Sequence, residues 1–115
     1  MKLIRTLRVL RSMSNNLPSN SFQNLENEIV GLASLYFKAV DLNKQKDNQR
    51  HLPFIETIRK TYQQLSIEER KVIDNEFFYK KYPLWWKANY SQISYKKLKH
   101  KSMAHFLEVF YDTAI

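Results

Sequence analysis

Glycine is almost missing from this sequence, and its scarcity restricts the folds that the chain can adopt. The 115 residues contain one glycine, Gly31, and three prolines. Proteins built from β-strands need many turns, and tight turns depend on glycine and proline. Val, Ile and Thr, which favour strands, are also sparse beside Leu, Lys, Glu, Gln and Asn. The sequence therefore predicts an all-α protein.

Length and apolar spacing indicate how the helices are organised. A chain of 115 residues is long enough for one modest hydrophobic core and too short for two. We expect a single compact bundle of about five or six helices that covers residues 1–115. Residues 1–64 would supply scaffold or dimerisation helices, and residues 65–115 would supply a part with a helix-turn-helix.

The longest run of helical periodicity covers residues 22–42, and Ser21 is suited to cap its N-terminus. Gly31 lies in the middle of this run. Because glycine costs about 1 kcal/mol inside a helix, we expect a second helix to approach closely there. The apolar face is wide enough to predict a well-buried helix, and consists of Phe22, Leu25, Ile29, Val30, Leu32, Ala33, Tyr36, Phe37, Ala39 and Val40.

Two further helices are predicted in the centre of the chain, after a polar loop at residues 43–51. Pro53 suits the first turn of a helix. Ser66 and Glu69 have the spacing of a capping box, so a new helix begins after Ser66 and should end near Lys81, before Pro83. The residues expected to face inward are Ile55, Ile58, Tyr62 and Leu65 on the first helix, and Val72, Ile73 and Phe77 on the second.

The N-terminal residues predict a short amphipathic and basic helix from Lys2 to Ser12, followed by a loop to Ser21. Three roles are open for it: packing on the core, serving as a flexible basic arm, or lying on a membrane. A signal peptide is not expected, because Arg5, Arg8 and Arg11 interrupt the apolar residues. No apolar run approaches the roughly 20 residues needed to span a bilayer.

Charge and cysteine content limit the classes of function. Nineteen Lys and Arg residues against eleven Asp and Glu residues give a net charge of +8. This excess favours a polyanionic partner, although a merely soluble, lysine-rich surface is the alternative. The chain has no cysteine, which excludes disulfides, thiolate metal sites and cysteine nucleophiles, and is typical of cytoplasmic proteins.

The C-terminal region predicts two helices separated by a short turn. Leu84–Tyr90 is expected to be a short aromatic helix, residues 91–94 a turn, and Tyr95 to about Asp112 a long helix. In such a motif Ala88 would let the helices approach each other, Ser94 would cap the second helix, and Ile93 and Leu98 would anchor it. This is the outline of a helix-turn-helix DNA reader.

The second of these helices begins with a run of lysines that could bind a duplex. The ammonium groups would contact phosphates, and the polar side chains near the start of the helix would contact phosphates or base edges. The predicted nucleic-acid-binding residues are Ser91, Gln92, Ser94, Tyr95, Lys96, Lys97, Lys99, His100 and Lys101.

A family resemblance points the same way over roughly residues 62–110. The region resembles the region-4 helix-turn-helix of sigma factors, is closer still to ArpU-type phage transcriptional activators, and is similar to an uncharacterised group of small mycoplasma proteins. The resemblance implies that the helix after the turn enters the major groove and that RNA polymerase is a partner. It depends on Leu65-Ser66, Glu68-Glu69-Arg70, Val72-Ile73, Phe77-Phe78-Tyr79, Trp86, Ser91, Ser94-Tyr95, Leu98-Lys99 and Phe106.

We therefore expect a DNA-binding transcription regulator or RNA polymerase accessory factor that acts on double-stranded DNA and could form a homodimer. An enzyme is not expected. The three histidines are scattered, and one glycine cannot build a phosphate-binding loop, so we predict no metal, cofactor or membrane partner. Two alternatives stay open: a helical protein-protein adaptor with a basic surface, and an RNA- or ribosome-associated protein.

Overall fold

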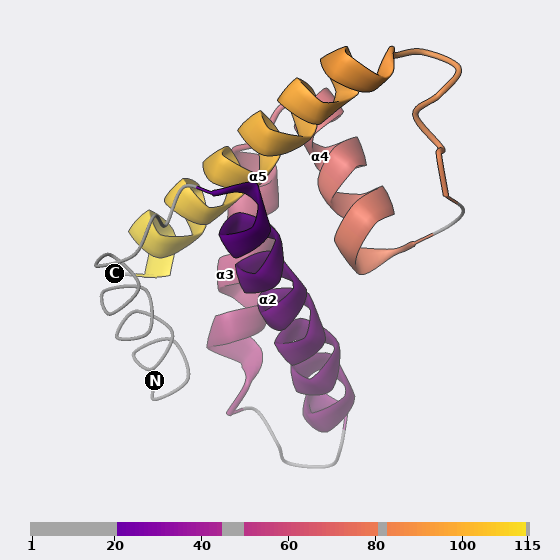
Figure 1. Ribbon diagram of the computed structural model, residues 1–115. Helices are drawn as coiled ribbons and strands as arrows, with labels where there is room; N and C mark the ends of the chain where they lie inside the picture. The colour runs from indigo at the N-terminus through magenta and orange to yellow at the C-terminus, as the bar shows by residue number, and fades with distance from the viewer. Residues whose placement is uncertain (1–20, 45–49, 81–82, 115) are drawn as a thin grey trace.

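The computed structural model describes residues 21–44, 50–80 and 83–114, and it contains helices and no β-strand in these ranges (Figure 1). The elements are α2 (Phe22–Asn43), α3 (Leu52–Gln63), α4 (Ile67–Ile73), the π-helical segment η1 (Asp74–Phe78) and α5 (Gln92–Ala114). The all-α prediction is confirmed, with fewer helices in the described part than expected. The predicted helix at 2–12, the loop that follows it and most of the loop at 43–51 lie outside the described residues.

Helix α2 begins and ends close to where the sequence predicts. The Ser21 hydroxyl caps it by accepting a hydrogen bond from the Asn24 amide at 3.2 Å. Five residues of the predicted face are buried, but the face is narrower than expected, because Val30 and Phe37 are 49% and 37% exposed. The buried residues are Leu25, Ile29, Leu32, Ala33 and Ala39.

The prediction of a close helix contact at Gly31 is wrong. A β-carbon added at Gly31 would meet no heavy atom within 4 Å, and the residue is exposed. No described helix therefore requires glycine at this position. Its cost in helix propensity is not offset by packing within the described residues.

Helices α3 and α4 are joined by a short, well-bonded turn. Pro53 lies in the first turn of α3, as predicted. The capping box is also confirmed: the Ser66 hydroxyl accepts from the Glu69 amide, and the Glu69 carboxylate accepts from the Ser66 amide at 2.9 Å. The Arg70 guanidinium donates to the carbonyl oxygens of residues 62, 63 and 65, which satisfies the free end of α3.

Helix α4 changes into η1 without a break in the chain. The Tyr79 amide donates to the Asp74 carbonyl oxygen at 2.6 Å, five residues back, and so widens the final turn. As a result Phe77 and Phe78, although adjacent, are both buried. The helix predicted to end near Lys81 ends at Phe78 instead, and Lys81 itself lies outside the described residues.

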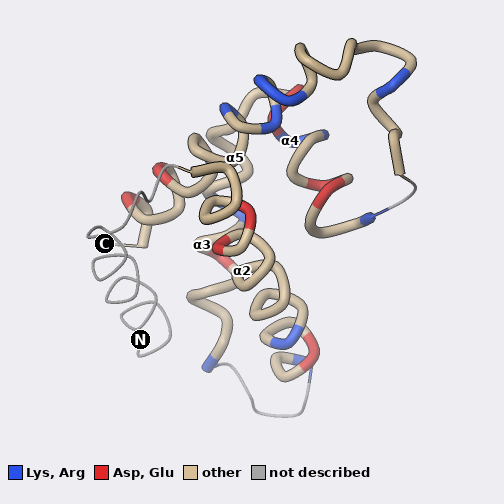
Figure 2. The backbone as a smooth tube through the Cα atoms, in the orientation of Figure 1, with Lys and Arg blue, Asp and Glu red and all other residues tan. Residues whose placement is uncertain are grey.

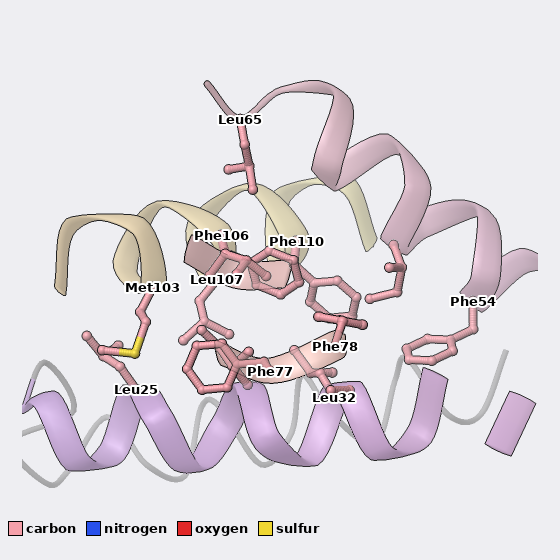
Figure 3. Close-up of a cluster of buried hydrophobic side chains, with 14 of the residues drawn as sticks. Leu25, Leu32, Phe54, Leu65, Phe77, Phe78, Met103, Phe106, Leu107 and Phe110 are labelled. Carbon is pink, nitrogen blue, oxygen red and sulfur yellow. The ribbon is translucent and has the colours of Figure 1, made fainter. Parts of the chain in front are cut away.

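The core forms where α5 crosses the other helices (Figure 1). Helix α5 packs on α2, α3 and α4, and α2 also packs on α3 and η1. Phe106 and Phe110 of α5 are completely buried in the centre (Figure 3). Their neighbours are Leu25 and Leu32 from α2, Phe77 and Phe78 from η1, and Met103 and Leu107 from α5. Among the described helices, none combines the length and the apolar character needed to cross a bilayer.

Candidate nucleic-acid interface

The N-terminal end of α5 differs from the predicted turn. Helix α5 begins at Gln92, and the Ser91 hydroxyl accepts from the Ser94 amide at 3.1 Å. Ser91 is therefore the capping residue in place of Ser94, and residues 92–94 form the first helical turn. The prediction that Ile93 is an inward anchor is wrong, because its side chain is 73% exposed.

The segment before α5 is not the predicted aromatic helix. Residues 83–89 form successive turns, in which the Lys87 amide donates to Leu84 and the Tyr90 amide donates to Trp86. Leu84 has a positive φ of 59°, which interrupts helical geometry. Ala88, expected at the closest approach of the two helices, is exposed. A helix-turn-helix built from residues 84–90 and α5 is therefore absent from the described structure.

Tyr95, predicted to contact DNA, is 4% exposed and organises this segment. Its ring stacks on Trp86 with centroids 4.5 Å apart and planes inclined by 7°. Trp85 meets the same ring edge-on at 5.6 Å. The two adjacent tryptophans thus pack against one tyrosine. These ring contacts hold residues 83–91 against the first turns of α5.

The carboxylate of Glu76 completes this aromatic cluster. It accepts hydrogen bonds from Trp85 Nε1 at 2.9 Å and from the Tyr95 hydroxyl at 2.8 Å. Lys99 Nζ lies 3.2 Å from Glu76 and 2.7 Å from Glu26. Burial by itself would raise the pKa of Glu76, but the donors Trp85 and Tyr95 and the charge of Lys99 lower it below its ordinary value.

Lys99 is therefore part of this cluster and is not available to a duplex. Its side chain is 15% exposed, and its ammonium group also lies over the rings of Phe22 and Phe77. Burial would lower its pKa, yet the carboxylates of Glu26 and Glu76 raise it, so Lys99 stays charged. Tyr95 and Lys99 were predicted to contact DNA, but their burial makes them unsuitable as contact residues.

The other predicted residues on α5 remain on the surface. Lys96, Lys97 and Lys101 are exposed, and no carboxylate of the described residues forms an ion pair with them. His100 is exposed beside them, with its ring stacked at 6.3 Å on Phe22. Gln92 and Ser94 are exposed on the first turn. The structure thus brings together Gln92, Ser94, Lys96, Lys97, His100 and Lys101, with Ser91 at the cap.

Charge is segregated along the length of α5, as Figure 2 shows. The lysines occupy the first half, whereas Glu108 and Asp112 occupy the second half and are exposed. Lys97 and Glu108 are eleven residues apart, or about 16 Å along a helix, which exceeds the screening length at physiological salt. The first half also carries the positive end of the helix dipole, so the potential there favours anions.

A different pair of helices does have the connectivity of a helix-turn-helix. Helices α3 and α4 are separated by three residues. However, the first turn of α4 carries Glu68 and Glu69, and Glu69 is 5% exposed. Negative charge at the start of the second helix would repel phosphates, so this pair is unsuited to the major groove.

One exposed basic residue that precedes α5 in the chain was not among the predicted contacts. Lys87 is exposed on the segment that leads into α5. Lys87 is a single lysine among aromatic residues, so no spacing of basic residues marks it as a contact. No protein-family model, curated protein or solved structure matches this chain, so the interface is judged on its geometry alone.

Proposed function

We propose that this protein binds double-stranded DNA through the exposed basic half of α5. The observation that carries the proposal is the row of Lys96, Lys97 and Lys101, which have no carboxylate partners in the described part of the chain. Each ammonium group can contact a phosphate and release a condensed counterion. The acidic residues of the same helix lie near its other end.

The side chains available favour contact with the DNA backbone over reading of bases. Arginine, which recognises guanine with two hydrogen bonds, does not occur in α5, whereas lysine acts as a point charge. Tyr95 lies in the core and cannot reach a groove. Only Gln92 and Ser94 present exposed polar side chains in the first turn. We therefore expect a strong dependence on salt and a weak dependence on sequence.

A role as a transcription regulator or RNA polymerase accessory factor stays a prediction of the resemblance to sigma region 4. The adaptor alternative has less support, because the apolar faces of α2 and α5 are largely used within the fold. RNA binding uses the same phosphate chemistry. It is separated from DNA binding by comparing duplexes of both kinds, because A-form RNA has a deep, narrow major groove that excludes a helix.

The experiment is a fluorescence-anisotropy titration of labelled duplex DNA with the full chain at several salt concentrations. A plot of the logarithm of the binding constant against the logarithm of the salt concentration has a negative slope. Replacing Lys97 and Lys101 together by Gln should reduce the magnitude of this slope by about 1.8, because two phosphate contacts are lost. A duplex of different sequence should bind the unmodified protein with nearly the same affinity.

The matched control replaces Lys38 by Gln. Lys38 is an exposed lysine in the C-terminal part of α2, whereas Phe22, at the other end of α2, stacks on His100 of the proposed interface. This variant should keep the salt slope of the unmodified protein. If Lys97→Gln/Lys101→Gln and Lys38→Gln weaken binding equally, the positive charge acts only in a diffuse way and the interface is misassigned. Tighter binding to duplex RNA than to DNA would favour the RNA alternative.

A further inference from the structure

A second candidate site adjoins η1, and its lining does not include Trp85, Tyr95 or Glu76 of the aromatic cluster. A pocket of about 320 Å³ opens between α2, α3 and η1. Four aromatic rings line it, from Tyr36, Tyr62, Phe78 and Tyr79, together with the carboxylate-bearing residue Asp74. Its size is in the range of small-molecule sites. The DNA-binding proposal uses none of these residues.

The rings are arranged as walls around a floor. Phe78 is 6% exposed and forms the floor. The rings of Tyr36 and Tyr62 stand nearly perpendicular to it, at 72° and 78°, with centroids 5.6 Å and 5.5 Å from that of Phe78. Tyr79 is 54% exposed at the rim. The exposed ring at the rim and the buried ring at the base make the pocket open on one side.

The π-helical turn is what gathers these groups. Asp74, Phe78 and Tyr79 all belong to η1 or follow it directly, and the wide turn sets them around one end of the segment. Segments of π-helix are rare and occur often at functional sites. An ordinary α-helical turn would rotate Phe78 and Tyr79 away from their present directions relative to Asp74.

The lining of the pocket carries one carboxylate, Asp74, and one guanidinium, Arg59. Burial raises the pKa of Tyr62 above its ordinary value, and the neighbouring Asp74 charge raises it further. Burial also raises the pKa of Tyr79, with contributions from Tyr36 and Asp74. The three tyrosines and the carboxylate are therefore close enough to influence one another. The Arg59 side chain is 60% exposed, and its charge is paired with Glu56 at 3.0 Å.

We infer that this pocket binds a methylated ammonium group, either of a small quaternary amine or of a trimethylated lysine side chain. Aromatic faces attract such cations through their quadrupoles, and a nearby carboxylate adds a charge attraction. A methylated ammonium is also apolar on its outside, so it loses little hydration on entering an aromatic pocket. An inorganic cation would instead need several oxygen ligands, whereas Asp74 is the only carboxylate residue among those lining this pocket.

The test is an NMR titration of the full chain, labelled on its aromatic side chains, with choline chloride. The control ligand is 3,3-dimethylbutan-1-ol, which has the shape of choline without the charge. Choline should shift the resonances of Tyr36, Tyr62 and Tyr79 in a saturable way, with a dissociation constant on the order of 1 mM. The neutral alcohol should cause much smaller shifts. A second arm uses N-acetyl trimethyl-lysine amide, and the tighter of the two cations indicates the source of the group.

Two substitutions separate the ring contribution from the charge contribution. Tyr79→Leu keeps an apolar rim and should weaken choline binding about fivefold, and Asp74→Asn should weaken it about tenfold. Asp41→Asn removes an exposed carboxylate elsewhere on α2 and should leave the affinity unchanged. Because Tyr79 is half exposed, its replacement should not unfold the chain.

Three results would overturn the inference. The first is equal binding of choline and the neutral alcohol, which would indicate a plain apolar pocket. The second is an absence of saturable shifts up to about 50 mM choline. The third is unchanged affinity in both the Tyr79→Leu and Asp74→Asn variants. Each variant's dispersed NMR spectrum reports whether it remains folded, so a loss of binding can be separated from a loss of structure.

Discussion

Replacing Glu76 by Ala should detach residues 83–91 from α5 and destabilise the protein by about 3 kcal/mol, because a buried polar group left without a partner costs about 1–3 kcal/mol. The Tyr95 hydroxyl and the Trp85 N–H would both lose their acceptor. Tyr95 is 4% exposed, so its hydroxyl cannot easily recover a bond to water, whereas Trp85 is half-buried and recovers part of the loss. Lys99 would keep Glu26 as its partner.

Urea denaturation measures this loss. With a slope of about 1.5–3 kcal/mol per molar, the midpoint should fall by about 1–2 M. Both tryptophans of the chain, Trp85 and Trp86, lie in the cluster, so fluorescence reports on it directly while far-ultraviolet circular dichroism reports on the helices. In the variant, the fluorescence transition should move to lower urea more than the circular-dichroism transition.

The matched control is Glu56→Ala, which removes an exposed carboxylate paired with Arg59 at 3.0 Å. Exposed ion pairs contribute about 0–1 kcal/mol, so the midpoint should change little. A double-mutant cycle of Glu76→Gln with Tyr95→Phe should give a coupling energy of about 1 kcal/mol. If Glu76→Ala costs no more than Glu56→Ala, the hydrogen-bonded cluster does not hold the segment in place and the reasoning fails.

Three other predictions concern stability. Gly31→Ala should stabilise the protein by about 0.5–1 kcal/mol, since its β-carbon would meet open space, and a lower melting temperature would contradict this. Phe106→Ala should cost about 3–5 kcal/mol in urea denaturation, because the ring is completely buried, and a cost below that of Ser66→Ala, about 1 kcal/mol, would be inconsistent with a central role in the core. Glu69→Gln should flatten the acid branch of the stability curve. Burial raises the pKa of Glu69, but hydrogen bonds from Ser66 and His105 lower it overall, so its stabilisation is present above the ordinary value of 4.5 and is lost as the pH falls through the lowered folded pKa. Parallel acid branches in the variant and the unmodified protein would exclude this contribution.

The helices themselves follow from local sequence chemistry. The caps at Ser21 and Ser66, the proline in the first turn of α3 and the apolar faces of α3 and α4 are properties of short stretches, because caps and periodic apolar residues act within one or two turns. These parts could be predicted without coordinates. The sequence did not separate the exposed lysines Lys96, Lys97 and Lys101 from Lys99, whose side chain is 15% exposed.

The candidate sites depend on contacts between residues far apart in the chain. By spacing alone, Lys99 and Tyr95 are surface residues of a lysine-rich helix. In the structure, however, Glu76 of η1 binds both of them and Glu26 of α2 also binds Lys99. The aromatic pocket likewise needs Tyr36 and Tyr62 to meet η1. The local sequence indicates which segments can form helices and which of their residues carry charge. Only the packing of α5 across three other helices decided which charges stay exposed, because desolvation and pairing depend on neighbours that the local sequence does not contain.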